Sequence, residues 1–291
     1  MTATSDLIIE RRQMRRRLAF WRILAVVALL AVAIVVLPRP SGESRSDHVA
    51  RISIDGMIFD DPERDARLAK LAEDSRAKAV ILRINSPGGT VAGSEALFHS
   101  IRAVAEKKPV VAVMSEVAAS GGYVAALAAD HVIARTTTIT GSIGVRIDSF
   151  GFQQAMEELG IERRLLTAGD NKGILDPFSP LREDQRDFLL GILERLHGQF
   201  IAEVREGRGD RLKGGDEIFS GLFWSGEQAV DLGLADAFGS SSYVAREVIK
   251  AEKIVDFTKE KDLLAIFADR LGSAMARALF STTGSGLPVM R

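Results

Sequence analysis

The residues best placed to do chemistry are a serine and the two glycines that follow it, Ser120, Gly121 and Gly122. A β-rich run over residues 110–114 leads into them through a turn of small residues, and the alanine-rich segment after them predicts a helix. A helix start presents unpaired backbone N–H groups, so a hydroxyl there can be a nucleophile whose developing oxyanion meets main-chain donors. The alternative is that Ser120 only caps the helix, which is a common role for serine.

A second turn rich in glycine precedes the serine. It has the sequence Asn85-Ser86-Pro87-Gly88-Gly89-Thr90 and follows an apolar run over residues 79–84. Adjacent glycines adopt conformations that a side chain would forbid, so their N–H groups can approach a substrate closely. Turns that leave successive strands of an open α/β sheet lie at one edge, where such folds have their sites. One turn could supply the nucleophile and the other an oxyanion donor; a purely structural strand–helix turn is the alternative.

The base that such a serine needs is harder to identify. The four histidines lie in a linker, on predicted helix faces or at the start of a strand, and none suggests a base. A lysine can replace histidine when burial or neighbouring positive charge keeps its amine neutral. Lys172, in the glycine-containing loop over residues 167–178, is the candidate, and a solvated loop lysine is the alternative. No metal-ligand spacing occurs, so the sequence predicts neither a metal site nor a cofactor.

The elements that must position these residues alternate between strand and helix patterns. The pattern predicts strands over residues 49–54, 79–84, 110–114, 131–135, 143–147 and 163–167, and helices over residues 62–76, 90–107, 152–159, 226–232 and 263–280. A further long helix is predicted to open at Ser179-Pro180, with an apolar stripe of Leu189, Ile192, Leu193, Leu196 and Phe200. This alternation predicts an α/β fold of stacked ββα or βαβ units with a largely parallel sheet.

An apolar segment precedes the α/β part. Residues 18–37 are interrupted only by Arg22 and have the length that crosses ~30 Å of hydrocarbon as a helix. Five arginines between residues 11 and 17 predict a cytoplasmic N-terminus, with the bulk of the chain on the other side of the membrane. A cleaved signal peptide is the alternative, because Ala31-Val32-Ala33 has the small-x-small form. Cleavage there would expose four apolar residues, so an uncleaved anchor is favoured.

Composition limits the remaining classes of function. The 291 residues carry a net charge of −1, which gives no reason to expect a nucleic-acid partner. Cysteine is absent, so thiol nucleophiles, disulfides and thiolate metal sites are excluded. The predicted organisation is a cytoplasmic N-terminus (1–17), an anchor (18–37), a linker (38–47), the α/β domain (48–240), a helical extension (241–280) and a disordered tail (281–291).

Four motifs in order along the chain resemble the signal peptide peptidase A family, membrane-anchored serine peptidases with a ClpP/crotonase-like fold. They are Asn85-Ser86-Pro87-Gly88-Gly89, Ala119-Ser120-Gly121-Gly122-Tyr123, Thr140-Gly141-Ser142-Ile143-Gly144-Val145, and Lys172 with Pro177-Phe178-Ser179-Pro180. The resemblance covers about residues 49–240 and extends to the N-terminal anchor.

This resemblance implies a Ser–Lys dyad, with Ser120 as nucleophile and Lys172 as general base. It implies oxyanion donors near Gly88 or Gly89 and Gly121, and a site that Ser142 helps to shape. The implied substrates are signal peptides left in the membrane and other hydrophobic peptides, cleaved at the extracytoplasmic side of the plasma (inner) membrane. Single-copy members of the family form octamers in which serine and lysine come from adjacent subunits, which implies a homo-oligomer here.

Two other functions stay open at this point. Crotonases share the fold and use loop N–H groups, so an acyl-CoA hydratase or isomerase is one alternative. The anchor argues against it, because such substrates are cytosolic. The second alternative is a catalytically inactive membrane scaffold.

Overall fold

The computed structural model describes residues 14, 16–27, 46–249 and 253–258. The chain divides into two compact units, Met1–Glu43 and Ser44–Arg291. In the first unit, residues 16–27 form a helix with exposed apolar side chains, including Phe20 and Ile23. Within the described ranges, no helix combines the length and apolar character that a membrane crossing requires. The predicted anchor over residues 18–37 continues past residue 27 into residues outside the described part.

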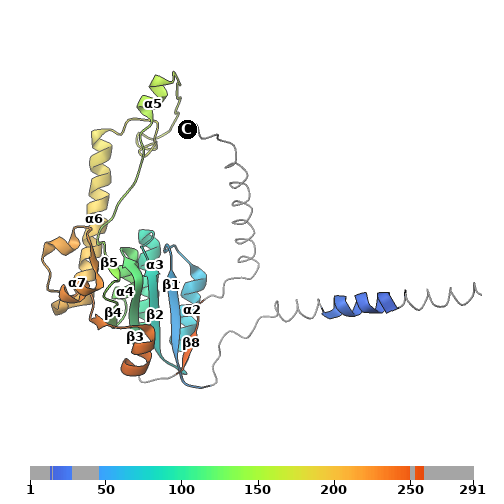
Figure 1. The fold of residues 1–291 in the computed structure, drawn as a ribbon. Coiled ribbons are helices and arrows are strands. Elements are labelled where there is room, and N and C mark those ends of the chain that lie inside the picture. Colours follow the sequence, from blue (N-terminus) through green and yellow to red (C-terminus); the bar gives the residue numbers. More distant parts are fainter. Residues whose placement is uncertain (1–13, 15, 28–45, 250–252, 259–291) are drawn as a thin grey trace, which may run out of the picture. The chain divides into compact units, whose positions relative to one another are not determined.

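The second unit is built on a twisted, mostly parallel sheet (Figure 1). Its described strands run in the order β6-β5-β3-β2-β1-β8, and β4 pairs with β3 and β7. All neighbours are parallel except β5 and β6. The strands are β1 (His48–Asp55), β2 (Ala77–Ser86), β3 (Val110–Ala119), β4 (His131–Ala134), β5 (Ile139–Gly141), β6 (Phe223–Ser225), β7 (Ala237–Phe238) and β8 (Ile254–Asp256). The predicted α/β class with a largely parallel sheet is confirmed.

Strand β2 is covered on both faces of the sheet, which explains its nearly continuous apolar sequence. Leu82 and Ile84 enter the main core under the helices, whereas Ile81 joins a second cluster with Val244 and Ala245 on the opposite face. Successive side chains of a strand point to opposite faces, so a strand covered on both sides needs apolar residues at almost every position.

Helices pack on the sheet and on one another. Helix α2 packs on α3, α3 on α4, and α4 on α6. The helices are α2 (Pro62–Glu73), α3 (Val91–Ala105), α4 (Gly121–Leu127), α5 (Gln153–Glu158), α6 (Glu183–Arg208), α7 (Gly226–Asp231) and α8 (Ser241–Tyr243), with short helical turns at Gly209–Arg211, Asp216–Phe219 and Val244–Val248. The helices predicted over residues 62–76, 90–107, 152–159 and 226–232 are confirmed, with boundaries that differ by a few residues.

Helix α6 is longer than the core on which it packs. At 1.5 Å per residue its length is about 39 Å. Phe200 and Val204 of its second half are buried, but Leu189, Ile192, Leu193 and Leu196 of the predicted stripe are only half-buried. Figure 1 shows α5 beside the first end of α6, away from the sheet. We call residues 146–196, which include α5 and the first half of α6, the arm.

Several sequence predictions are wrong in detail. Residues 143–147 form no strand, because positive φ angles at Gly141 (84°) and Ser142 (51°) turn the chain out of the sheet after β5. Residues 163–167 form none either, since they lie exposed in the arm with no strand to pair with. The long helix begins at Glu183 because Ser179 is held in a turn, where its Oγ donates to Asp176 Oδ2 at 2.6 Å.

The C-terminal part adds one strand that the sequence pattern does not indicate. Strand β8 pairs with β1, so the sheet extends beyond residue 240. The predicted helix over residues 263–280 and the tail over 281–291 lie outside the described residues.

A nearly buried ion pair fixes the end of α6 to the core. Arg208 is 2% exposed, and its Nη2 donates to Asp236 Oδ1 at 2.6 Å while its Nε donates to Gly233 O at 2.7 Å. Asp236 Oδ2 also accepts from the Val132 N–H at 2.7 Å. Burial alone would raise the pKa of Asp236, but these hydrogen bonds and the Arg208 charge outweigh it and hold the pKa below its ordinary value.

Substitution of Asp236 by alanine should lower the free energy of unfolding by about 3 kcal/mol, because it leaves the buried Arg208 charge unpaired. Urea denaturation of the full-length protein in detergent measures this change, with the exposed Asp210→Ala as control. A carboxyl whose pKa is lowered in the folded state stabilises the fold at pH values above its unfolded pKa of about 3.9. This contribution is lost as the pH falls through the folded-state pKa. Wild-type stability should therefore fall more steeply below about pH 4 than that of Asp236→Ala. Equal free energies of unfolding for wild type and Asp236→Ala would contradict the role assigned to the Arg208–Asp236 ion pair.

Candidate active site

Ser120 lies at the junction between β3 and α4 in a conformation that only a constrained residue keeps. Its φ of 51° and ψ of −124° fall outside the regions that non-glycine residues favour. Its half-buried side chain makes no capping hydrogen bond to α4, so the N-cap alternative is not what the geometry gives. A strained strand-to-helix turn that presents a free hydroxyl is the arrangement in which nucleophilic serines occur.

Strand β5 holds the backbone of Ser120 from one side. The Ser120 N–H donates to Gly141 O at 2.8 Å, continuing the pairing of Ala119 with Gly141. Ser142, the next residue, also has a positive φ of 51°, and its N–H donates to Leu222 O at 2.8 Å. The Thr-Gly-Ser turn therefore lies directly beside Ser120.

The glycine turn after β2 approaches Ser120 from the other side. A Cβ added to Gly88 would lie 2.9 Å from the Ser120 Cβ, and Gly88 has a φ of 114°. A Cβ on Gly89 would lie 1.8 Å from Ile58 O in the loop after β1. That loop holds the turn through two hydrogen bonds, from Ile58 N–H to Gly88 O and from Thr90 N–H to Ile58 O, both 2.9 Å. Glycine is therefore required at both positions.

Gly121 completes the group of small residues. A Cβ added to it would lie 3.2 Å from Gly89 N and 2.1 Å from Ser94 Oγ. The Gly121 N–H belongs to the first turn of α4, where helical N–H groups have no partner within their own helix. Ser120, Gly88, Gly89, Gly121 and Ser142 thus come together at the carboxyl ends of β2, β3 and β5.

Sequence reasoning missed two residues of this region, Ile58 and Ser94. Ile58 lies in an irregular loop, where no pattern marks it. Ser94 carries a weak signal, because it lies three residues before Leu97 on the inward face of α3, where an apolar residue would be expected.

Lys172 is not brought to Ser120 within one chain. The residue is exposed, and its N–H donates to Gly169 O at 3.1 Å in a turn of the arm. The neighbouring Asn171 Oδ1 accepts from Arg182 Nη2 at 3.0 Å, immediately before α6. Figure 1 shows this end of α6 beside α5 and away from β3 and α4.

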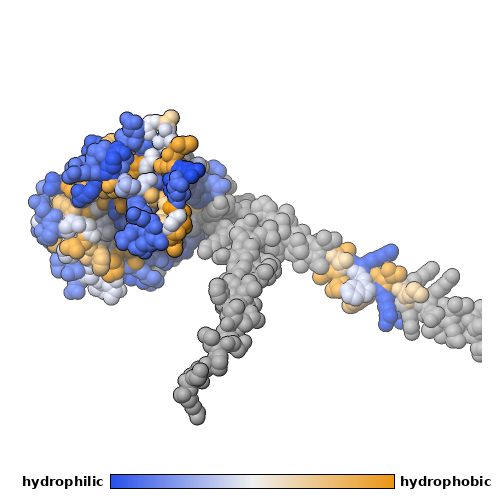
Figure 2. All heavy atoms as spheres, turned by 90° about the horizontal axis from the view of Figure 1, so that it is seen from above, coloured by the Kyte–Doolittle hydropathy of each residue, from blue (hydrophilic) through white to orange (hydrophobic). Residues whose placement is uncertain are grey.

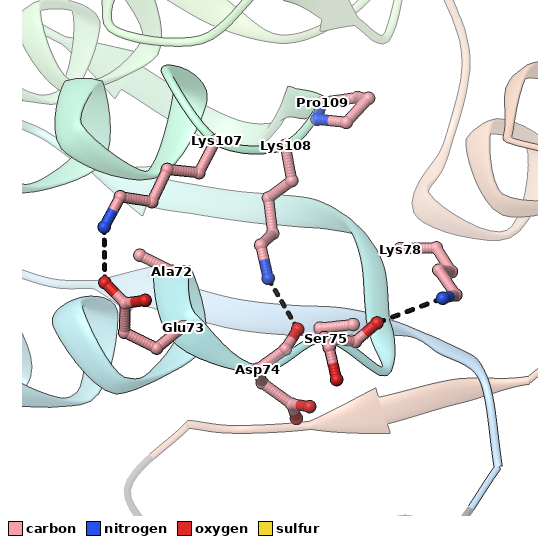
Figure 3. Close-up of a pocket in the computed structure, with 9 residues that line it drawn as sticks. Ala72, Glu73, Asp74, Ser75, Lys78, Lys107, Lys108 and Pro109 are labelled. Carbon is pink, nitrogen blue, oxygen red and sulfur yellow. Dashed lines mark hydrogen bonds and ion pairs between the residues drawn. The ribbon is translucent and has the colours of Figure 1, made fainter.

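A cavity of about 300 Å³ lies beside the amino ends of β2 and β3, opposite the ends that carry Ser120 (Figure 3). Its lining includes Lys107, which pairs with Glu73, and Lys108, whose Nζ donates to Leu71 O and Asp74 O at 2.7 Å. Burial lowers the pKa of Lys108. Lys108 satisfies carbonyls at the C-terminal end of α2 and Lys107 pairs with a carboxylate there, so both lysines have a structural role. The lining residues do not include Ser120.

Substitution of Ser120 by glycine should raise the free energy of unfolding by about 1 kcal/mol relative to Ser120→Ala, because only glycine adopts this conformation without strain. Both variants lack the hydroxyl, so the comparison isolates the backbone. Parallel urea titrations test it, and an alanine variant as stable as the glycine variant would mean that the backbone at this position is unstrained.

Comparison with known proteins supplies a family. The model of peptidase family S49 matches residues 102–255, which are 154 of the 291 residues. A Na⁺/H⁺ antiporter NhaA of Brucella abortus is 44% identical over 174 residues, 59% of this chain and 24% of the relative. The chain therefore spans about a quarter of the length of that relative.

Two further relatives match over more of their length. A putative protease of Methanocaldococcus jannaschii is 30% identical over 262 residues, 81% of this chain and 84% of the relative. A putative signal peptide peptidase of Enterococcus faecium is 27% identical over 224 residues, 72% of this chain and 65% of the relative. On the family match and the extent of the M. jannaschii alignment, the chain belongs to peptidase family S49.

Proposed function

We propose that this chain is a serine endopeptidase with a ClpP/crotonase-like fold that degrades hydrophobic peptides, remnant signal peptides among them. Ser120 is the nucleophile and Lys172 the general base of a Ser–Lys dyad. The observation that carries the proposal is the strained backbone of Ser120 between two glycine turns. Membership of peptidase family S49 supports the reaction class, and the relative named as a signal peptide peptidase supports the substrate class.

The reaction begins when Ser120 Oγ forms a bond to the carbon of the scissile carbonyl. The carbonyl π electrons move to oxygen, and the hydroxyl proton passes to the neutral Nζ of Lys172. Collapse of the tetrahedral intermediate expels the amine, which takes that proton, and leaves an acyl-enzyme. Water then attacks the ester by the same route and regenerates Ser120. This sequence needs neither a metal nor a cofactor.

The oxyanion is received by the main-chain N–H groups of Gly89 and Gly121. Gly88 is the weaker candidate, because its N–H already donates to Ser86 Oγ at 3.1 Å. The proposal for these two donors is supported by the closeness of the two residues, since a Cβ added to Gly121 would lie 3.2 Å from Gly89 N. Ser142 shapes the opposite wall.

Lys172 reaches Ser120 from a neighbouring protomer. Support comes from its exposed position in the arm and from the apolar side chains that the arm leaves uncovered, with exposed fractions of 76% for Phe150, 73% for Leu159 and 95% for Leu166. Figure 2 views the molecule from the end where α5 lies in Figure 1, and apolar residues reach its surface among polar ones. A homo-oligomer, an octamer by family resemblance, would cover them and complete the site.

The N-terminal segment tethers the peptidase to the lipid bilayer of the plasma (inner) membrane, with the catalytic domain on the extracytoplasmic side. The exposed apolar side chains of the helix over residues 16–27 support this part of the proposal. A tether raises the effective concentration of enzyme near peptides that barely leave the bilayer.

Substitution of Ser120 by alanine should reduce hydrolysis of a fluorogenic hydrophobic peptide at least about a thousandfold, because the nucleophile is lost. Ser100→Ala, on α3, is the matched control and should keep wild-type activity. Equal activity of Ser120→Ala and wild type would overturn the proposed function. Retention of an acyl-CoA without acylation of Ser120 would favour the crotonase alternative.

Lys172→Ala should abolish turnover as Ser120→Ala does, whereas the exposed Lys70→Ala should not. Oligomers assembled from equal amounts of Ser120→Ala and Lys172→Ala subunits should recover about a quarter of wild-type activity, because that share of interfaces pairs an intact serine with an intact lysine. Mixed oligomers are produced by co-expression with two affinity tags, and each homo-oligomer is the baseline. No recovery would mean that the base does not come from a neighbour.

A further inference from the structure

Ser94 carries a buried hydroxyl that the structure leaves without a partner. The residue lies in the first turns of α3 and is 4% exposed. Its N–H donates to Thr90 O at 3.0 Å, but its Oγ makes no hydrogen bond to the described residues. Two other buried hydroxyls near the site do find acceptors, since Thr140 Oγ1 donates to Ala118 O at 2.6 Å and Thr138 Oγ1 to Ser115 O at 2.6 Å.

The free hydroxyl lies against the residues that we propose as oxyanion donors. The position that a Gly121 Cβ would occupy is 2.1 Å from Ser94 Oγ and 3.2 Å from Gly89 N. Ser94 Oγ therefore packs against Gly121 on the side where a side chain would lie, and the Gly89 amide nitrogen is close to that same position. The absence of a side chain at Gly121 is what leaves room for it.

A serine inside a helix commonly donates a hydrogen bond from its side-chain hydroxyl to the carbonyl four residues earlier. Ser94 does not do so, although Thr90 O is its backbone partner. A buried hydroxyl without a partner destabilises a fold, so each such group in a native protein calls for an explanation, and a catalytic role is one. The atom that would arrive beside Gly89 and Gly121 is the oxygen of the scissile carbonyl.

We propose that Ser94 is a further catalytic residue, whose hydroxyl donates a third hydrogen bond to the oxyanion at the base of the hole formed by Gly89 and Gly121. The proposal rests on the proposed serine peptidase function. As negative charge develops on the carbonyl oxygen, a donor held beforehand in a water-poor site stabilises the transition state more than the ground state. The covalent steps given above are unchanged, and Ser94 keeps its proton throughout.

Ser94→Ala should lower kcat about a hundredfold with little change in KM, since removal of one oxyanion donor acts on the transition state. The melting temperature should stay level or rise, because the substitution removes an unsatisfied buried hydroxyl. Ser100→Ala, on the same helix, is the control for both measurements. The full-length protein in detergent is used throughout.

Binding of two ligands separates a catalytic from a packing role. A peptide boronate, which forms a tetrahedral adduct on Ser120, should bind Ser94→Ala about a hundredfold more weakly than wild type. An uncleaved peptide should bind Ser120→Ala and the double variant Ser120→Ala/Ser94→Ala equally. Wild-type kcat in Ser94→Ala, or equal weakening of both ligands, would overturn the role of Ser94 and leave the proposed function standing. Full activity of Ser120→Ala would instead remove the proposed function itself.

Discussion

The site depends on keeping one residue in a backbone conformation that it would not adopt alone. The strain at Ser120 costs about 1–3 kcal/mol, and the surrounding structure must supply at least as much. The hydrogen bond from its N–H to Gly141 O and the close approach of Gly88 constrain it from two sides. Neither constraint involves the Ser120 hydroxyl, so the hydroxyl itself stays available for chemistry.

The parallel sheet makes these contacts possible, because β2, β3 and β5 all end at one edge and turn there. The loop after β1 joins them when Ile58 exchanges two hydrogen bonds with the glycine turn. The turns that follow β1, β2, β3 and β5 therefore lie close together, and glycines at positions 88, 89 and 121 let their backbones approach. The arm is built differently, since its contacts are mostly internal, such as Phe152 against Phe178 at 5.7 Å between ring centroids.

Much of this arrangement could be predicted from the sequence, for identifiable reasons. The apolar runs of β1, β2 and β3 indicate strands that are buried on both faces of the sheet. The two glycine turns indicate where two stretches of backbone come close together. Residues 163–167 were predicted as a strand from local pattern alone, and local pattern does not reveal whether a partner strand exists. Ser94 was missed because a single hydroxyl on a helix face has many ordinary explanations. The exposure of Lys172 depends on how an entire segment folds, which no local motif encodes.

The continuous helix α6 has a mechanical consequence for the arm. Its end is fixed to the core through Arg208 and Asp236, and no break separates that end from Glu183. Inserting one residue near Leu196 would rotate everything before it by about 100° and shift it by about 1.5 Å. The length of this helix therefore sets the direction in which the arm carries Lys172 away from the core. We expect insertions and deletions within α6 to be tolerated much less well than those in the loops around α5.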